Sequence, residues 1–512
     1  MRAFRRPCVA LGAFVALASP ATSLPADDAG AAAIREVSAT GHRAAISLFR
    51  EFLAQPNDAH YPDQILALVE WLEPQFQSRG FATRRIATGG SPALFAERRH
   101  AGARGTALVY LQADGQPVDP SKWHQPDPYR AVLKERTPAG DWQLIDWPGD
   151  VAALDPDWRV FARSASDSKG PMVQFLAAID AMDEAGLVPP YDLKVIVDTE
   201  EELGSPQLAT AVAANHTLLA ADLLLVFDGP PHVSSRPTVV FGARGITTLT
   251  LTTYGPEAPQ HSGHYGNFLP NPAFALSHIL ASLKSPDGRV RVEGFYDGID
   301  LGAEVRRELA RVPDDEAALL ARMGVPRADQ VAPTLQEALQ YPSLNLRGLA
   351  SAWIGEQART IIPATAVAEL DIRTVVESDP ERLVGLVRRH IEALGYRVVD
   401  REPTSAERLE SPVVTLTHHI AYGAFRSDFD SAAGRVARAG MRRLYGEEPI
   451  LIRTLGGSVP IAPFVQTLGV PAALVPTVNP DNNQHSPNEN LRVGDFFEGI
   501  AIITSVLLSA PD

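Results

Sequence analysis

Three short polar segments of this 512-residue sequence carry residue types that bind hydrolytic metal ions. They are Ser-Asp-Ser-Lys-Gly around Asp167, Thr-Glu-Glu-Glu-Leu-Gly-Ser with Glu201 and Glu202, and His-Ser-Pro-Asn-Glu beginning at His485. Carboxylate and imidazole groups suit zinc when thiolates are absent. Apolar runs at 195–197 and 472–475 precede the glutamates and the histidine. We therefore expect the ligands on loops at strand ends, where α/β sheets carry their chemistry.

Each segment also has a plainer interpretation when it is taken alone. Ser-Asp-Ser-Lys-Gly is typical of a solvated turn, and three consecutive glutamates are typical of an acidic helix N-terminus. However, three adjacent carboxylates after an apolar strand crowd like charges together, which requires a cation or a raised pKa. The three segments together therefore favour a metal site.

In their residues and in their order along the chain, these segments resemble the motifs of the family of zinc aminopeptidases, dipeptidases and carboxypeptidases that includes carnosinase and glutamate carboxypeptidase. Residues 108–117, Leu-Val-Tyr-Leu-Gln-Ala-Asp-Gly-Gln-Pro, resemble the first motif of that family. The resemblance runs from about residue 51 to the end of the chain, and several motifs in the same order are a far more specific signal than one. It implies a hydrolase that cleaves the amide bond of dipeptides or short peptides, with metal-bound water as the nucleophile.

The resemblance also implies roles for individual residues of the metal site. Asp167 corresponds to a carboxylate shared by two ions, Glu202 and His485 complete the first ion, and Asp228 corresponds to a ligand of the second. Three protein ligands leave a coordination place for water on the first ion. Glu201 corresponds to the general base, which takes a proton from that water and delivers it to the leaving nitrogen.

Further residues are implied in substrate binding. His261 matches a lid histidine that reaches the active site of the partner subunit, which implies a homodimer. Thr360 and Arg373 match two positions of the lid, and Gly457 and Ser458 match a loop of the catalytic domain. In the family, these positions bind the terminal carboxylate of the substrate. Arginine suits such a bidentate contact. Without the resemblance, His261 is an ordinary loop residue and Arg373 a strand-end residue in a surface ion pair.

The sequence departs from the family at two places around the second ion. Gln112 stands where the family has a histidine, and Ser168 stands where it usually has a second carboxylate. Asp114, which would orient that histidine, loses its usual partner. An amide oxygen is a poorer zinc ligand than imidazole, so we expect one or two ions per chain, with the second site weakened or lost unless a neighbour such as His124 supports it. Zinc is the expected metal and manganese the alternative.

Three functional hypotheses remain open: a one-metal hydrolase, a two-metal hydrolase with an altered second site, and an inactive exported protein that binds peptides or amino acids. Hydrolysis is favoured because the other expected residues are all present. The substrate is a small peptide or an N-acyl amino acid, since deacylation of N-acyl amino acids uses the same water, base and carboxylate contact. The sequence does not choose between these two substrates.

Composition limits the class of protein. A chain with 45% hydrophobic and 21% charged residues can bury a substantial core, and its length allows two domains. A formal net charge of −15 disfavours nucleic acid as a partner. A basic start, an apolar stretch at 9–18 and small residues up to Ser23 predict a signal peptide over 1–23 and a periplasmic or secreted protein. The apolar stretch is too short for a membrane span.

Apolar runs and helix-like segments alternate along the first half of the chain, at 106–111, 173–182, 193–197, 209–214 and 223–227. This alternation predicts an α/β domain with a mixed, mainly parallel sheet covered by helices. The β-branched run at 246–253 begins a different pattern, with helices at 271–283 and 380–394 and strands at 366–373 and 396–399. We expect a catalytic domain over 24–244 and 405–512, interrupted by an α+β sandwich lid and dimerisation domain over 245–404. Residues 294–341 are rich in charge and predict an exposed helical insertion.

Overall fold

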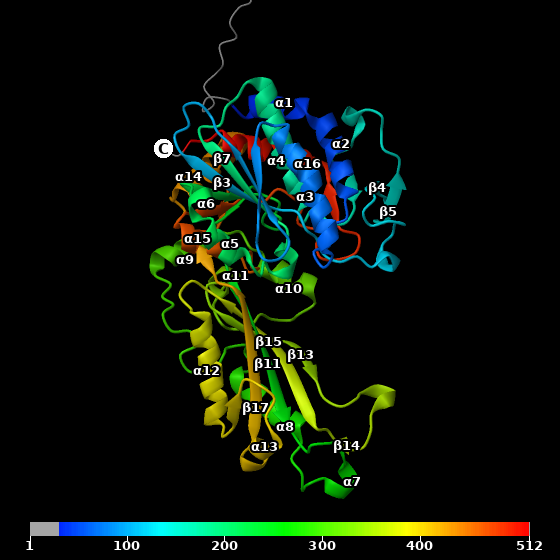
Figure 1. The fold of residues 1–512 in the computed structure, drawn as a ribbon, viewed down its shortest axis with the longest axis vertical. Helices are drawn as coiled ribbons and strands as arrows, with labels where there is room; N and C mark the ends of the chain where they lie inside the picture. The colour runs from blue at the N-terminus through cyan, green and yellow to red at the C-terminus, as the bar shows by residue number, and fades with distance from the viewer. Residues whose placement is uncertain (1–29, 511–512) are drawn as a thin grey trace, which may run out of the picture.

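The computed structural model describes residues 30–510 and divides them into two domains along one long axis (Figure 1). The first domain contains both ends of the described chain, and the second is inserted into it. The predicted signal segment, residues 1–23, lies outside the described residues. Within residues 30–510, no helix is long and apolar enough to cross a membrane.

The first domain is built on an eight-stranded sheet. Its order is β1 (Ala82–Ile86), β2 (Ala93–Arg98), β7 (Asp192–Asp198), β3 (Thr106–Gln112), β8 (Leu223–Val226), β20 (Ala472–Leu474), β9 (Thr238–Val240) and β19 (Ile450–Ile452). The central strands β7, β3, β8 and β20 are parallel to their neighbours in this group, whereas β1 and β2 are antiparallel at one edge. The predicted mixed, mainly parallel sheet is therefore confirmed.

Helices cover both faces of this sheet. One face packs against α1 (Ala31–Thr40), α2 (His42–Leu53), α3 (Pro62–Gln77), α4 (Lys169–Ala185), α14 (Ala432–Tyr445) and α16 (Val493–Leu507). The other packs against α5 (Leu208–Ala214), α6 (His216–Leu219) and α15 (Ala462–Leu468). Side chains of β3 alternate between these two cores, with Val109 and Leu111 in the first and Leu108 and Tyr110 in the second. This is why a continuous apolar run forms a central strand.

A second, antiparallel sheet in the first domain was not predicted. Its order is β21 (Asn490–Arg492), β6 (Arg159–Phe161), β4 (Val132–Arg136) and β5 (Trp142–Ile145). Short 3-10 helices lie nearby at Pro120–Lys122 and Val151–Ala153. Asn490 pairs with Phe161, so this sheet holds the segment after His485 beside the segment before Asp167.

The inserted domain contains a five-stranded sheet with two long helices on one face. The strand order is β13 (Ser343–Ala350), β15 (Thr365–Thr374), β11 (Gly245–Tyr254), β17 (Val413–Tyr422) and β16 (Arg397–Val399). Alternate residues of β11 are buried, and they form one core with α8 (Pro272–Leu283) and α12 (Pro380–Ala393). The strands and helices expected from the sequence in this region are present.

The inserted domain extends beyond the boundary predicted at residue 404. Strand β17 pairs with β11 over most of its length, so the inserted sheet continues to Tyr422. The chain then returns through β18 (Phe425–Arg426), which pairs with β10 (Gly242–Ala243) where the chain left the first domain. The two crossings therefore lie side by side. The β-branched run at 413–417 was the signal for this additional strand.

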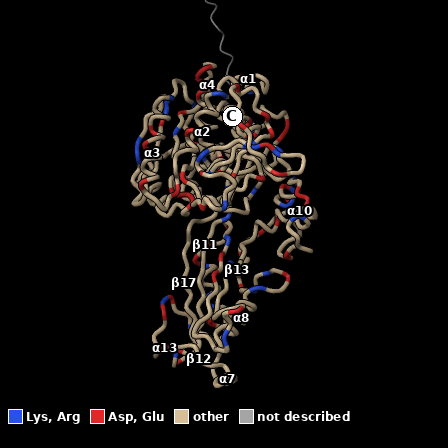
Figure 2. The backbone as a smooth tube through the Cα atoms, turned by 90° about the vertical axis from the view of Figure 1, so that its right-hand side faces the viewer, with Lys and Arg blue, Asp and Glu red and all other residues tan. Residues whose placement is uncertain are grey.

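Residues 294–341 form the helices α9 (Ala303–Leu309), α10 (Glu316–Met323) and α11 (Leu335–Ala338). The predicted helical insertion is present, but it also contacts the first domain. His232 Nε2 lies 3.0 Å from Asp314 Oδ1, and Arg453 Nη1 lies 3.4 Å from Glu308 Oε2. Figure 2 shows α10 beside the first domain, above the long inserted strands. The insertion therefore contributes to the junction between the domains.

The far end of the inserted domain carries several small elements. They are β12 (Gln260–His261), β14 (Ile361–Ile362), α7 (Ser262–Tyr265), α13 (Ser405–Glu410) and a 3-10 helix at Gly355–Gln357. Strands β12 and β14 pair with each other, away from the five-stranded sheet. In Figure 1, α7 and β14 lie at the end of the molecule opposite the first domain.

Candidate active site

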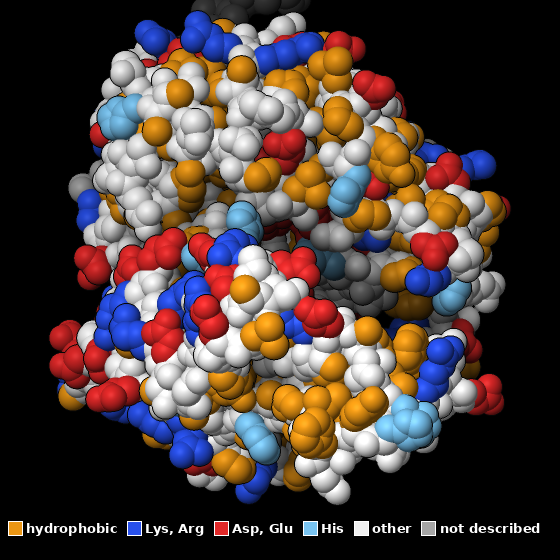
Figure 3. Space-filling model, turned by 60° about the horizontal axis from the view of Figure 1, so that its bottom comes forward, with side chains coloured by type: hydrophobic (Ala, Val, Ile, Leu, Met, Phe, Trp, Pro, Cys, Tyr) orange, Lys and Arg blue, Asp and Glu red, His pale blue; other side chains and the backbone are white. Residues whose placement is uncertain are grey.

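Three neighbouring parallel strands end at the same edge of the large sheet. Strand β3 ends at Gln112, and Glu201 and Glu202 follow β7 in a 3-10 helix (Glu201–Leu203). Asp228 follows β8 by two residues. Asp167 lies directly before α4, and His485 lies in the loop between β20 and β21. The expectation that polar residues gather at carboxyl ends of strands therefore matches the geometry. Figure 3 shows a hollow between the two domains with acidic side chains at its back.

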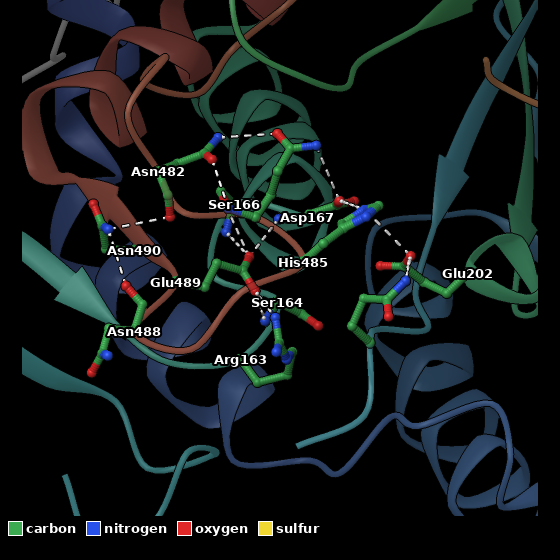
Figure 4. Close-up of polar contacts among 12 residues, drawn as sticks. Arg163, Ser164, Ser166, Asp167, Glu202, Asn482, His485, Asn488, Glu489 and Asn490 are labelled. Carbon is green, nitrogen blue, oxygen red and sulfur yellow. Dashed lines mark hydrogen bonds and ion pairs between the residues drawn. The ribbon is translucent and has the colours of Figure 1, made fainter. Parts of the chain in front are cut away.

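Asp167, Glu202 and His485 form a compact group of metal-binding side chains. His485 Nε2 lies 2.9 Å from Asp167 Oδ2 and 3.4 Å from Glu202 Oε2. One ligand atom from each residue lies within 4.8 Å of the other two, and Figure 4 shows the imidazole between the carboxylates. Within residues 30–510, no other group of three or more His, Cys, Asp or Glu side chains meets this geometry, and His124 is not part of it. Two carboxylates and one imidazole fit a zinc or manganese ion.

The electrostatics of this group also favour a cation. Burial and the neighbouring Asp167 raise the pKa of Glu202 to about 8. The same two causes raise the pKa of Asp228 to about 7. The hydrogen bond to Asp167 raises the pKa of His485 to about 9. Carboxylates crowded in this way repel one another when ionised, and a bound cation would relieve that repulsion.

Glu489 fixes the loop that carries Asp167. Its fully buried carboxylate accepts hydrogen bonds from Arg163 Nη1 at 2.8 Å and from backbone N–H groups of Ser164, Ser166 and Asp167 at 2.8–2.9 Å (Figure 4). Arg163 is only 3% exposed, so this is a buried ion pair. Sequence reasoning did not assign a role to Glu489. Its place at the end of the His-Ser-Pro-Asn-Glu segment was the available signal.

Asp114 and Asp198 fix the loop that carries Glu201 and Glu202 through hydrogen bonds. Asp114 Oδ2 accepts the backbone N–H of Glu202 at 2.9 Å, and burial followed by the charge of Asp198 raises the pKa of Asp114. Asp198 accepts hydrogen bonds from Tyr110 and Ser205. The resemblance gives Asp114 the role of orienting the histidine that Gln112 replaces, and in the structure Asp114 positions the backbone of Glu202 instead. Asp198 was missed, because a carboxylate at the end of a strand has no motif of its own.

Glu201 is close to the carboxylates of the site and to Tyr422 of the inserted domain. Burial raises its pKa, and the charges of Asp167, Glu202 and Asp114 raise it further. Burial, followed by the charge of Glu201, raises the pKa of Tyr422 at the end of β17 to about 12. A carboxylate with a raised pKa beside a metal-binding group is suited to proton transfer near neutral pH.

Gln112 and Ser168 make hydrogen bonds at the position expected for a second ion. Gln112 Nε2 donates to Asp167 Oδ1 and to Ser168 Oγ, each at 2.9 Å. Ser168 Oγ donates to Asp228 Oδ1 at 2.7 Å. The structure thus places Gln112 and Asp228 beside Asp167, as expected, but joins them through hydrogen bonds.

The predicted carboxylate-binding residues divide into two groups. Arg373 Nη1 donates to Ser458 Oγ at 2.5 Å, and Gly457 precedes that serine, so these residues from both domains meet at the junction. Thr360 and His261 do not join them. Both are exposed at the far end of the inserted domain, where the backbone N–H of Ser262 donates to the carbonyl of Thr360 at 3.0 Å.

Sequence reasoning missed one arginine at this junction. Arg244 donates through Nε and Nη2 to the carbonyl of Gly456 at 3.0 and 2.8 Å. Burial, with a smaller contribution from the charge of Arg373, lowers its pKa to about 10. Arg244 therefore supports the loop that carries Ser458 and adds positive charge near Arg373. Its position directly before Gly245, at the domain boundary, was the available signal.

A two-domain fold with carboxylate and imidazole groups at the domain junction is typical of a metal-dependent hydrolase. The sequence profile of Peptidase family M20/M25/M40 matches residues 138–509, and the chain belongs to that family. It is a metallopeptidase that hydrolyses peptide bonds. The family resemblance inferred from the sequence segments is confirmed.

Individual relatives agree with this assignment. The chain is 26% identical over 421 residues to the Cys-Gly metallodipeptidase dug1 of Schizosaccharomyces pombe, covering 78% of each chain. It is 25% identical over 434 residues to human Beta-Ala-His dipeptidase, covering 81% of this chain and 77% of the relative. Among solved structures, the metallo-carboxypeptidase Sso-CP2 from Sulfolobus solfataricus superposes with a TM-score of 0.75 at 26% identity, covering 91% of this chain and 99% of that one.

Proposed function

We propose that this protein is a metal-dependent dipeptidase that acts on short peptides with a free terminal carboxylate. The observation that carries the proposal is the convergence of Asp167, Glu202 and His485 beside Glu201 at the domain junction. The relatives named as Cys-Gly and Beta-Ala-His dipeptidases support small peptides as the substrate class. The carboxypeptidase Sso-CP2 supports recognition of a terminal carboxylate.

Asp167, Glu202 and His485 would hold the catalytic ion, with zinc as the expected metal and manganese as the alternative. When bound, such an ion supplies Lewis acidity that polarises a carbonyl group and lowers the pKa of water. The chain contributes a fixed ligand geometry, because Glu489 holds the Asp167 loop and Asp114 holds the backbone of Glu202.

Glu201 would act as the general base and then the general acid. Its carboxylate takes a proton from the attacking water and passes it to the nitrogen of the cleaved amide bond. A raised pKa suits both steps, since the group must hold the proton between them. Burial is the main cause of that raised pKa, and the charges of the surrounding carboxylates add to it.

Arg373, Ser458 and Gly457 would bind the substrate carboxylate. Arg373 comes from β15 of the inserted domain and Ser458 from the first domain, so the substrate would bridge the two domains. A guanidinium group binds a carboxylate through two parallel hydrogen bonds. Arg244 would add to the positive potential at this end of the cleft.

We infer a homodimer in which His261 and Thr360 complete the site of the partner subunit. Both residues are exposed, and they directly precede α7 and β14, which lie at the end of the molecule opposite the first domain. The inserted domain also exposes large apolar side chains, namely Phe268, Phe274, Leu349, Trp353 and Ile354. Figure 3 shows hydrophobic side chains gathered on the face of this domain that points toward the viewer. An edge strand, β13, and an exposed apolar surface are typical of a protein interface.

Export is a separate part of the proposal. It rests on the basic start, apolar stretch and small residues within 1–23. Expression in a bacterium followed by N-terminal sequencing of the periplasmic fraction tests it. A mature chain that begins shortly after Ser23 supports export, whereas an intact Met1 in the cytosolic fraction contradicts it.

A substrate panel tests the proposed activity. The metal-loaded protein is incubated with dipeptides, the same dipeptides amidated at the C-terminus, and N-acyl amino acids, and the free amino acids are quantified. We expect release from the dipeptides and much slower release from the amides, which lack the carboxylate for Arg373. Faster turnover of N-acyl amino acids would identify a deacylase instead. Binding without any product would identify an inactive binding protein.

A further inference from the structure

Four side chains of the protein are joined by hydrogen bonds at the position where the family resemblance places a second ion. Gln112, Ser168, Asp167 and Asp228 meet there at the carboxyl ends of the central strands. Gln112 is 5% exposed, Asp167 7% and Ser168 2%, so the contacts among these three are shielded from water, and Asp228 is half-buried. This cluster touches the metal-binding group of the proposed function only through Asp167.

The hydrogen atoms in this cluster match its acceptors. A glutamine amide carries two N–H hydrogens and a serine hydroxyl carries one. The amide directs its two hydrogens at Asp167 Oδ1 and Ser168 Oγ, and the hydroxyl directs its hydrogen at Asp228 Oδ1. Two of these hydrogens therefore point at the carboxylates of Asp167 and Asp228, and the third points at the hydroxyl oxygen of Ser168.

Turning the amide over does not restore a good metal site. Its oxygen would then be a neutral ligand, which binds zinc less strongly than imidazole or a carboxylate. The amide hydrogens would also lose Asp167 and Ser168 as acceptors, and a buried polar group left without a partner is costly. The hydroxyl of Ser168 would still lie between Asp167 and Asp228, at 2.9 and 2.7 Å.

Asp114 gives an independent observation. Its Oδ2 accepts the backbone N–H of Glu202, but its buried Oδ1 has no hydrogen-bond partner within the described part of the chain. Asp114 lies two positions after Gln112, just beyond the end of β3. Gln112 nevertheless points at Asp167, and no donor from position 112 reaches Asp114. An imidazole at position 112 could face Asp167 and Asp228 with one nitrogen and Asp114 with the other.

We propose that this chain holds one metal ion, because the hydrogen bonds from Gln112 to Asp167 and from Ser168 to Asp228 replace a second ion. Asp167 Oδ1 then accepts from Gln112, and Asp167 Oδ2, which lies 2.9 Å from His485 Nε2, would remain for the single ion. Asp228 is held by Ser168 and supports the arrangement as a hydrogen-bond acceptor. The inference rests on the proposed function for the ion at Asp167, Glu202 and His485.

Metal stoichiometry tests this inference without measuring activity. The protein is stripped with a chelator, reloaded with excess zinc, freed of loose ion by gel filtration and analysed for zinc per chain. We expect about one tightly held ion per chain in the unmodified protein, since only one set of three good ligands exists. About two ions per chain, or none, would overturn the inference.

Two variants test the cause. In Gln112→His/Ser168→Ala, the imidazole supplies a good ligand and the alanine removes the hydroxyl between Asp167 and Asp228, so zinc should rise to about two ions per chain. In Asp228→Asn, zinc should stay at about one ion per chain, because Asp228 serves no ion in the unmodified protein. If the first variant does not fold, the zinc content of Asp228→Asn still shows whether Asp228 binds an ion. A ratio unchanged in a folded first variant, or a ratio lowered by Asp228→Asn, would overturn the inference.

The result is separable from the proposed function. A protein that holds one zinc ion and cleaves no peptide refutes the proposed activity and leaves this inference standing. A protein that cleaves dipeptides and holds two ions tightly supports the proposed activity and refutes this inference.

Discussion

The carboxylate of Glu489 accepts the backbone N–H of Asp167 at 2.9 Å, across 322 residues of sequence. The same carboxylate pairs with the buried guanidinium of Arg163 at 2.8 Å. Two segments of the first domain that are far apart in the sequence are thereby joined beside the metal-binding group. His485 belongs to the same loop as Glu489, so one buried carboxylate aligns two of the three expected ligands.

Glu489→Gln should strongly destabilise the protein. Removing one partner of a buried ion pair leaves Arg163 uncompensated, which costs on the order of 3–5 kcal/mol. Urea unfolding of the metal-free protein measures this loss without the contribution of a bound ion. Glu36→Gln, at an exposed helix position, is the matched control and should change little. Equal stability of both variants would show that the Arg163–Glu489 pair does not hold this loop.

Glu201→Gln should keep the metal and lose the reaction. The amide cannot exchange the proton, so turnover should fall by about 10²–10⁴-fold, while zinc per chain stays unchanged. Glu202→Gln is the contrasting variant, because it removes an expected ligand and should lower zinc binding as well. Near-normal turnover in Glu201→Gln would show that a group other than Glu201 transfers the proton.

Much of the fold follows from local patterns in the sequence. The continuous apolar runs at 106–111 and 193–197 form β3 and β7, which are covered on both faces and therefore have no polar side. The alternating run at 246–253 forms β11, which buries one face only. Gln112, Glu202 and Asp228 lie together because β3, β7 and β8 are parallel neighbours whose carboxyl ends meet at one edge of the sheet.

Other features depend on contacts that no local pattern reveals. The four-stranded sheet containing β4 and β6 is built from short strands with mixed burial, which have weak periodicity. The inserted domain continued past residue 404 because β17 returns to pair with β11 over a long sequence distance. The sequence showed that Gln112 is a poor ligand. It did not show that Ser168 would share its hydrogen bonds.

Subunit mixing tests whether His261 acts across a dimer. His261→Ala and Glu201→Gln chains should each be nearly inactive alone. Mixed and allowed to exchange, they should recover partial activity, because one site of a heterodimer then keeps both groups. Mixing Glu201→Gln with Glu202→Gln is the control, since both changes lie in the same site and no intact site forms. Absence of recovery after proven exchange would place His261 outside the reaction.

His42→Phe should reduce the loss of stability in mild acid. His42 stacks on Phe497 with ring centroids 3.9 Å apart, and burial lowers its pKa from 6.5 to about 4. The neutral ring is favoured in the folded state, so its contribution is present above about pH 6.5 and is lost as the pH falls toward 4. The half-buried position suggests an effect of about 1 kcal/mol between about pH 7.5 and pH 5.

Urea unfolding of both forms at the two pH values measures this difference. The phenylalanine keeps the ring stacking and removes the titration. An equal loss of stability in the two forms would show that His42 titrates normally in the folded protein.

Metal removal and reloading tests the central claim most directly. The protein is stripped of metal, shown to be metal-free by elemental analysis, and assayed for release of free amino acids from a dipeptide before and after zinc or manganese is restored. We predict no hydrolysis in the metal-free protein and recovery on reloading. His485→Ala should not recover under the same loading, because one of the three ligands at Asp167, Glu202 and His485 is gone. Full hydrolysis by the metal-free protein would contradict the account.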